Sequence, residues 1–241
     1  MENKTSKYFK YAIGEIVLVV IGILIALQLN IQKEDANEKK ATKALLIGIQ
    51  SDLQLEVERI DYLTTYYSDI VNGMQRLIEH QQGKETYSNE QLGGYFLETG
   101  EFRKFSKFNI NYQTLYGSGL LQEIKDPKLA EQIIQYYSMQ FLEWSLEIYQ
   151  QKAGNFNFNE VKIFDPIDKL QVKTNYKNIP NFRLEMKDEF KTDFGSFINE
   201  PAVLNFLLDL MHQSGLVFKN LNNYRDLNIA LSGKINTYNN D

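Results

Sequence analysis

The stretch from Tyr11 to Leu29 constrains the fold more than any other part of the chain. Every residue from Ile16 to Leu27 is apolar or glycine, and with its flanks the run approaches the ~20 residues that a helix needs to cross the hydrocarbon core of a bilayer. We therefore expect a transmembrane helix over residues 11–31. A short N-terminal tail over residues 1–10 precedes it, and an extramembrane helical domain over residues 32–241 follows it.

The charges beside this run predict its orientation. Lys4, Lys7 and Lys10 precede it against a single acid, Glu2, and a short basic tail before the first apolar segment favours an inside N-terminus. We expect a signal-anchor in the inner (cytoplasmic) membrane, with the N-terminus inside. In a Gram-negative bacterium this orientation places the body in the periplasm.

Two other interpretations of the run stay open. A basic start and a twelve-residue apolar centre also suit a cleaved secretory signal, but Ala26-Leu-Gln28 is a poor match to the small-residue cleavage site. A buried core helix is the other alternative.

The apolar run is polarised. Gly22 and Ala26 form a small-x-x-x-small pair, which lets two membrane helices approach closely. Glu15 lies about one turn inside the run, where an acid is costly unless it reaches the headgroups or meets a partner. We infer that one half of the helix associates with a second copy or with another membrane protein, through Gly14, Glu15, Leu18, Gly22, Ala26 and Gln28.

The body after the membrane run predicts a mainly α fold, with a long helix followed by an irregular α-helical bundle. Apolar residues recur at alternating three- and four-residue steps, a pattern typical of a long bundle helix, and only Glu56 interrupts it. Gly83 is the expected helix end. The members of this heptad stripe are Leu46, Ile49, Leu53, Ile60, Leu63, Tyr67, Ile70, Met74 and Leu77.

Further local signals divide the rest of the body. Ser88 and Gln91 form a capping box, residues 102–112 read as an aromatic loop, and Asp126-Pro127 is a helix start. We expect one helix over residues 128–152 with Trp144 in the core. We also expect two helical segments after Asn199, with a break or a bend between them at Gly215. A loop-rich insertion is expected near residues 153–199, where residues 153–182 are the candidate lid or binding loop. Val161–Phe164 and Leu170–Val172 suit brief strands but lack an evident partner.

Two segments carry a family resemblance. The stretch Lys7–Asn30 and the Tyr112–Gly119 turn, which is followed by the double tyrosine Tyr136-Tyr137, are similar to features of the DUF6090 type, a family of uncharacterised membrane-anchored proteins of Bacteroidota. That family usually continues with Asn-Asn-Trp after the membrane run, whereas this chain has Asn30-Ile31-Gln32. The resemblance implies a membrane location and a helical architecture, with no activity, cofactor or catalytic residue.

Residues typical of catalysis are sparse. The chain has no cysteine, only two histidines, His80 and His212, and none of the common nucleotide-binding or nucleophile motifs. A net charge of −5 without a basic patch argues against nucleic acid. We therefore expect no catalysis and no cofactor, and a scaffold or adaptor whose partners are membrane lipid and an envelope protein. The alternatives are a sensor or ligand-binding domain with the 153–182 loop over the bundle, an accessory subunit of an ion- or proton-coupled complex that uses Glu15, and an unrecognised hydrolase.

Overall fold

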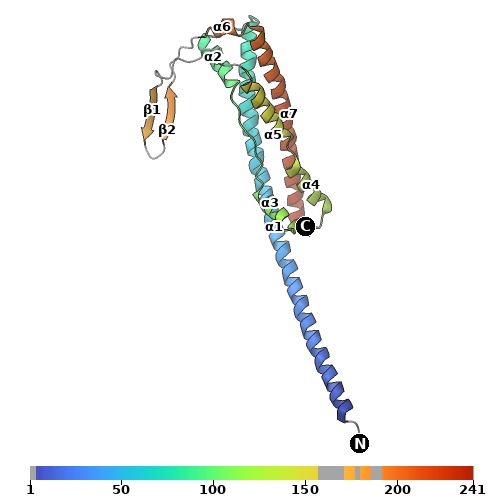
Figure 1. Ribbon diagram of the computed structural model, residues 1–241. Helices are drawn as coiled ribbons and strands as arrows, with labels where there is room; N and C mark the ends of the chain where they lie inside the picture. Colours follow the sequence, from blue (N-terminus) through green and yellow to red (C-terminus); the bar gives the residue numbers. More distant parts are fainter. Residues whose placement is uncertain (1–3, 157–170, 177–179, 186–191, 241) are drawn as a thin grey trace. The chain divides into compact units, whose positions relative to one another are not determined.

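The protein is mainly α-helical in the computed structural model, as the sequence predicts (Figure 1). The structure describes residues 4–156, 171–176, 180–185 and 192–240. Its elements are α1 (Lys4–Gln81), α2 (Asn89–Glu98), α3 (Ile110–Gly117), the 3₁₀ turn η1 (Leu120–Glu123), α4 (Pro127–Ser138), α5 (Phe141–Gly154), β1 (Gln171–Tyr176), β2 (Pro180–Glu185), α6 (Phe194–Phe197) and α7 (Pro201–Asn240).

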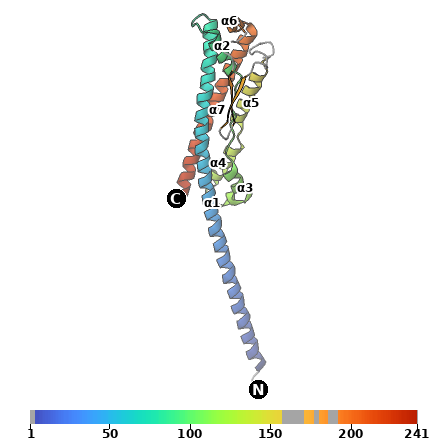
Figure 2. The same cartoon turned by 90° about the vertical axis from the view of Figure 1, so that its left-hand side faces the viewer.

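The chain divides into two compact units. Unit 1 contains residues 1–53, 108–137 and 231–241, and unit 2 contains residues 54–107 and 138–230. The long helix α1 is continuous over its 78 residues in both views (Figure 2). This continuity agrees with the absence of proline, and its few glycines each cost only about 1 kcal/mol inside a helix.

Unit 1 is built where α1 meets α3, η1, α4 and the end of α7. Thr42 donates to the Leu120 carbonyl, and the Lys125 amide donates to the Tyr238 hydroxyl. Gly48 lets α3 approach α1, because a Cβ at this position would lie 2.5 Å from the Asn111 side chain. The buried apolar residues of this unit are Leu46, Ile49, Leu53, Leu115, Ile124, Leu129, Ile133, Tyr136, Leu231 and Ile235.

Unit 2 packs the remaining part of α1 against α2, α5, α6 and α7. The predicted stripe is confirmed, since its members in this unit are at most 3% exposed. Rings meet edge to face at Tyr67 and Tyr149, and at Phe96 and Phe197, an arrangement that adds to the free energy of apolar burial. The stripe members in this unit are Ile60, Leu63, Tyr67, Ile70, Met74 and Leu77.

Several local predictions are confirmed by the backbone. Gly83 adopts φ +70° directly after α1, where a residue with a Cβ would be strained. Both reciprocal bonds of the capping box between Ser88 and Gln91 are present. The Asp126 carboxylate accepts from the Lys128 amide at the start of α4. Residues 101–109 form no helix or strand, but the expected 102–112 loop ends earlier than predicted, because α3 begins at Ile110.

The expected single helix over residues 128–152 is wrong. Met139 and Gln140 are not helical, so α4 and α5 are separate. The predicted face continued from Leu129 to Trp144 and Ile148, but α5 buries Leu142, Leu146 and Tyr149 instead. On a helical wheel, the buried face of α5 lies about 150° from the face that the sequence pattern predicted through Trp144 and Ile148. Trp144 is therefore 58% exposed rather than part of the core.

The expected break at Gly215 is also wrong, because α7 runs through it. No heavy atom outside its local helix lies within 4 Å of a Cβ placed on Gly215, so close packing does not explain the glycine. The helix has buried residues on both sides of it, Leu210 and Val217 among them. Their burial outweighs the roughly 1 kcal/mol helix penalty of one glycine.

The loop-rich insertion contains a short hairpin. β1 and β2 pair antiparallel, with Val172 opposite Leu184. The partner that the sequence did not reveal is the next segment, Pro180–Glu185, where Phe182 and Leu184 alternate with polar residues as in a strand. Most of the predicted 153–182 binding loop, including Val161–Phe164, lies outside the described residues.

Candidate functional site

The residues predicted for membrane association lie on the N-terminal part of α1. Residues 13–37 are all exposed, and Leu18 on this face is 74% exposed. A Cβ at Gly14 or Gly22 would meet nothing within 4 Å in the described structure. Helix geometry places Gly14, Glu15, Leu18, Gly22, Ala26 and Gln28 within about 160° of one another.

This helix also meets the length and composition needed to cross a membrane. Its most apolar window has a mean hydropathy of 2.3 and is 0% buried. A soluble core helix of such composition would be covered by other elements, because exposure of large apolar side chains to water is unfavourable. The exposure argues against the buried-core interpretation, while a retained anchor and a signal sequence both remain compatible with it.

Two small residues of this face, Gly22 and Ala26, lie on the side of α1 opposite to the core of unit 1. At 100° per residue, Glu15, Gly22 and Ala26 lie within about 20° of one direction. Leu46, Ile49 and Leu53, which are buried in unit 1, lie on roughly the opposite side of the same helix. A helix that packs on Gly22 and Ala26 would therefore approach α1 from the side that the unit 1 core leaves open.

A buried polar cluster in unit 2 was not predicted from the sequence. Glu56 is 0% exposed and accepts a hydrogen bond of 3.3 Å from the amide of Asn228, which is also 0% exposed. The Oδ1 atom of Asn228 has no hydrogen-bond partner among the described residues. The signal that could have revealed this cluster was the interruption of the heptad stripe at Glu56.

Lys107 is the cation of the same cluster. Its ammonium donates to the Met139 carbonyl, beside the break between α4 and α5. It lies 3.9 Å from the Glu143 carboxylate and 5.1 Å from the centre of the Tyr224 ring. Burial lowers the pKa of Lys107, and the nearby charges of Glu143 and Glu56 oppose that effect.

Tyr224 completes the cluster from α7. Its hydroxyl donates to Glu143 at 2.8 Å, and its ring packs edge to face on Phe105 and Phe141. Burial raises the pKa of Tyr224, and the hydrogen bond to Glu143 raises it further. Charges and donors that are matched inside a core favour one helix register over its alternatives, so we interpret this cluster as structural.

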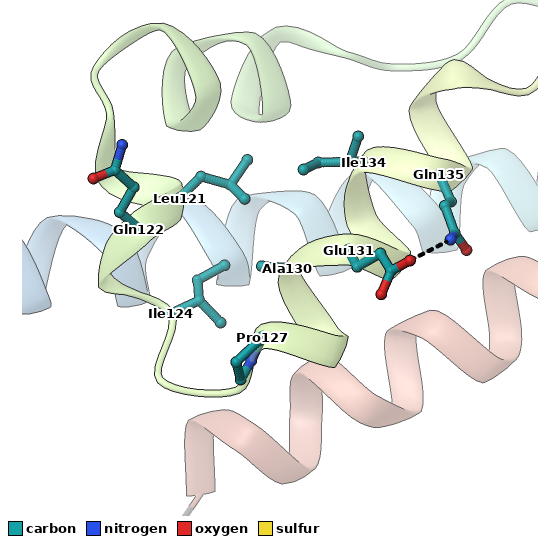
Figure 3. A pocket seen from close by; sticks show the side chains of 8 residues that line it. All are labelled: Leu121, Gln122, Ile124, Pro127, Ala130, Glu131, Ile134 and Gln135. Atoms are coloured by element: carbon teal, nitrogen blue, oxygen red, sulfur yellow. Dashed lines mark hydrogen bonds between the residues drawn. The ribbon is translucent and has the colours of Figure 1, made fainter.

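An apolar groove lies on unit 1, beside η1 and α4 (Figure 3). Its volume is about 530 Å³. Leu121, Ile124 and Ile134 supply much of its apolar surface, and a hydrogen bond of 2.9 Å joins Gln135 to Glu131 at its edge. The remaining lining residues are Gln122, Pro127 and Ala130. An apolar floor with few polar groups suits an apolar ligand or side chain.

The potential metal ligands in the described part of the chain are scattered. No group of three or more His, Asp or Glu side chains there is arranged to hold a metal ion. His80 accepts from the Tyr87 amide through Nδ1, whereas His212 is exposed on α7.

Comparisons with protein-family models, with curated proteins and with solved structures find no match for this chain.

Proposed function

We propose that the protein is a single-pass membrane-anchored helical scaffold or adaptor, without catalysis, that associates laterally through its transmembrane helix. The observation that carries the proposal is the exposed apolar run on α1, which continues without a break into a folded helical body. Apolar side chains over residues 13–31 span about 28 Å along a helix, close to the ~30 Å hydrocarbon core of a bilayer.

The continuity of α1 supports a retained anchor over a cleaved signal. The helix has no break between residues 31 and 42. This polar segment therefore forms a rigid connection between the membrane run and the folded part of unit 1. A stalk of this kind holds a binding body at a fixed distance from the bilayer. The basic tail supports an inside N-terminus with the body on the opposite side of the inner membrane, in the periplasm of a Gram-negative cell.

The anchor is tested by intact-mass measurement on protein extracted from membranes. The full mass, together with resistance to carbonate extraction, is expected. A mass that lacks the first ~28 residues, with the body in the soluble fraction, would show that the run is a signal.

Lateral association is tested by cysteine crosslinking in native membranes, which the absence of natural cysteine makes clean. Single cysteines placed in turn over residues 14–28 are expected to crosslink to a second copy with a period of about 3.6 residues and a maximum near Gly22 and Ala26. A helix that binds another membrane protein instead is detected by mass spectrometry of the crosslinked product.

A matched pair of variants separates packing from anchoring. Gly22→Leu combined with Glu15→Ala is expected to abolish crosslinking and pull-down of any partner, because a large side chain separates the helices. Val20→Leu adds bulk on the opposite side and is expected to leave both unchanged. Unchanged association in the Gly22→Leu, Glu15→Ala variant would refute the assigned face while leaving the anchor intact.

A further inference from the structure

The C-terminal end of α1 contains a histidine whose protonation state is fixed by geometry. The Tyr87 backbone amide lies 3.1 Å from Nδ1 of His80. A backbone N–H can only donate, so Nδ1 must be the acceptor, and an acceptor nitrogen carries no proton. The hydrogen bond therefore requires the neutral imidazole with its proton on Nε2.

This bond closes the connection between α1 and α2. Gly83 turns the chain back at φ +70°, and the His80 ring then holds residue Tyr87, directly before the Ser88 N-cap of α2. The ring centres of His80 and Tyr87 are 6.2 Å apart. His80 thus joins the end of one helix to the start of the next across seven residues of sequence.

The start of α2 in turn holds α6. The Asn89 amide donates to the Thr192 carbonyl, and its side-chain oxygen accepts from the Phe194 amide. His80 borders the same segment, because a Cβ on Gly195 would lie 3.9 Å from Nε2. The imidazole therefore lies between the connection that precedes α2 and the segment of α6.

We propose that His80 is an acid-sensitive latch that ties the α1–α2 connection and the adjoining α6 in place when it is neutral and releases the connection when it is protonated. A protonated imidazole has two N–H donors and no acceptor, so it repels the Tyr87 amide proton. Histidines ordinarily change charge between pH 5 and 8, within the range that an envelope protein meets.

Charged groups of both signs lie on the elements around His80. The carbonyl end of α1 is negative, and Asp193 lies on the α6 side, 3.3 Å from the same Gly195 Cβ position. Titratable side chains on the neighbouring elements include Arg76 and Glu79 of α1, Lys84, Glu85 and Tyr87 of the connection, and Glu90, Tyr95 and Glu98 of α2.

The latch is tested on the full chain in detergent micelles with ¹⁵N-labelled histidine. Only two histidines contribute ring signals, and the His212→Gln variant assigns them. At pH 7.5 the His80 ring is expected to show the tautomer with hydrogen on Nε2. Between pH 7.5 and 5.5 the hydrogen-exchange protection factor of the Tyr87 amide is expected to fall roughly two- to tenfold, as for the loss of one hydrogen bond.

Two variants test whether His80 causes the change in the Tyr87 protection factor. His80→Gln offers an amide oxygen that accepts at every pH, so the Tyr87 protection factor is expected to become independent of pH. His212→Gln is the matched control and is expected to behave as the unmodified chain. A Tyr87 protection factor that does not change in the unmodified chain, or that changes equally in His80→Gln, would overturn the proposal, as would a proton on Nδ1 at pH 7.5.

Discussion

Removal of the Lys107 amine is expected to destabilise unit 2 more than removal of any exposed lysine. The Lys107→Met substitution keeps the apolar stem, and the Lys107 side chain is 7% exposed. It deletes the nitrogen that donates to the Met139 carbonyl. Leaving a partly buried acceptor without its donor costs about 1–3 kcal/mol. The ion pair with Glu143 adds little to this cost, because the Glu143 side chain retains 27% exposure and burial lowers the pKa of Lys107 in spite of Glu143.

Urea unfolding supplies the measurement. The single tryptophan, Trp144, lies in α5, so its fluorescence reports unit 2. A loss of about 2 kcal/mol with a slope of about 2 kcal/mol per molar urea shifts the midpoint by about 1 M. Lys104→Met changes an exposed lysine in the same segment and is expected to change stability by less than about 0.5 kcal/mol. Equal midpoints for the two variants would refute the assignment of Lys107 as the buried cation.

The pH dependence gives a second check of the same group. The pKa of Lys107 is lowered in the folded chain, whereas a lysine in the unfolded chain titrates near pH 10.4. Between these two values the unfolded chain binds the extra proton, so the Lys107 contribution to stability rises with pH. The difference in free energy of unfolding between the unmodified chain and Lys107→Met is expected to change across that window, and a flat difference would contradict the lowered pKa.

Three further predictions concern ionisation and helix formation. Burial raises the pKa of Tyr67, Tyr149 and Tyr224. Their contribution to the free energy of unfolding is therefore complete below about pH 10 and is lost above it, by up to about 4 kcal/mol per pH unit for the three together. Absorbance at 295 nm is expected to show that these tyrosines ionise only when the chain unfolds, and their titration near pH 10 in the folded chain would disprove the prediction. Gly215→Ala lies in open space inside α7 and is expected to stabilise the fold by about 0.5–1 kcal/mol in thermal unfolding; a loss would mean that the helix needs flexibility there. Ser88→Ala removes the side-chain acceptor of the capping box and is expected to cost about 1 kcal/mol, while Ser106→Ala, an exposed serine outside any helix, should cost almost nothing.

The sequence by itself determined the mainly α class, the position of the apolar run and most helix ends. These features depend on neighbours within a few residues: the run of apolar side chains from Ile16 to Leu27, the capping box at Ser88, the proline after Asp126 and the left-handed Gly83. Such signals act through backbone geometry and local hydrogen bonds, which are the same in any tertiary context. The heptad stripe was also readable, because one side of α1 is buried along the whole body.

Only the tertiary structure decided the break between α4 and α5, the continuity of α7 at Gly215 and the cluster around Lys107. The segment 128–152 has a helical pattern throughout. On one straight helix, however, Leu129 and Leu142 would lie on different sides and could not both be buried. Burial of both side chains therefore requires the break at Met139 and Gln140, although the local sequence favours a continuous helix. Glu56 and Asn228 are 172 positions apart. Their pairing depends on which helices pack together, and nothing within a few residues of either could encode it.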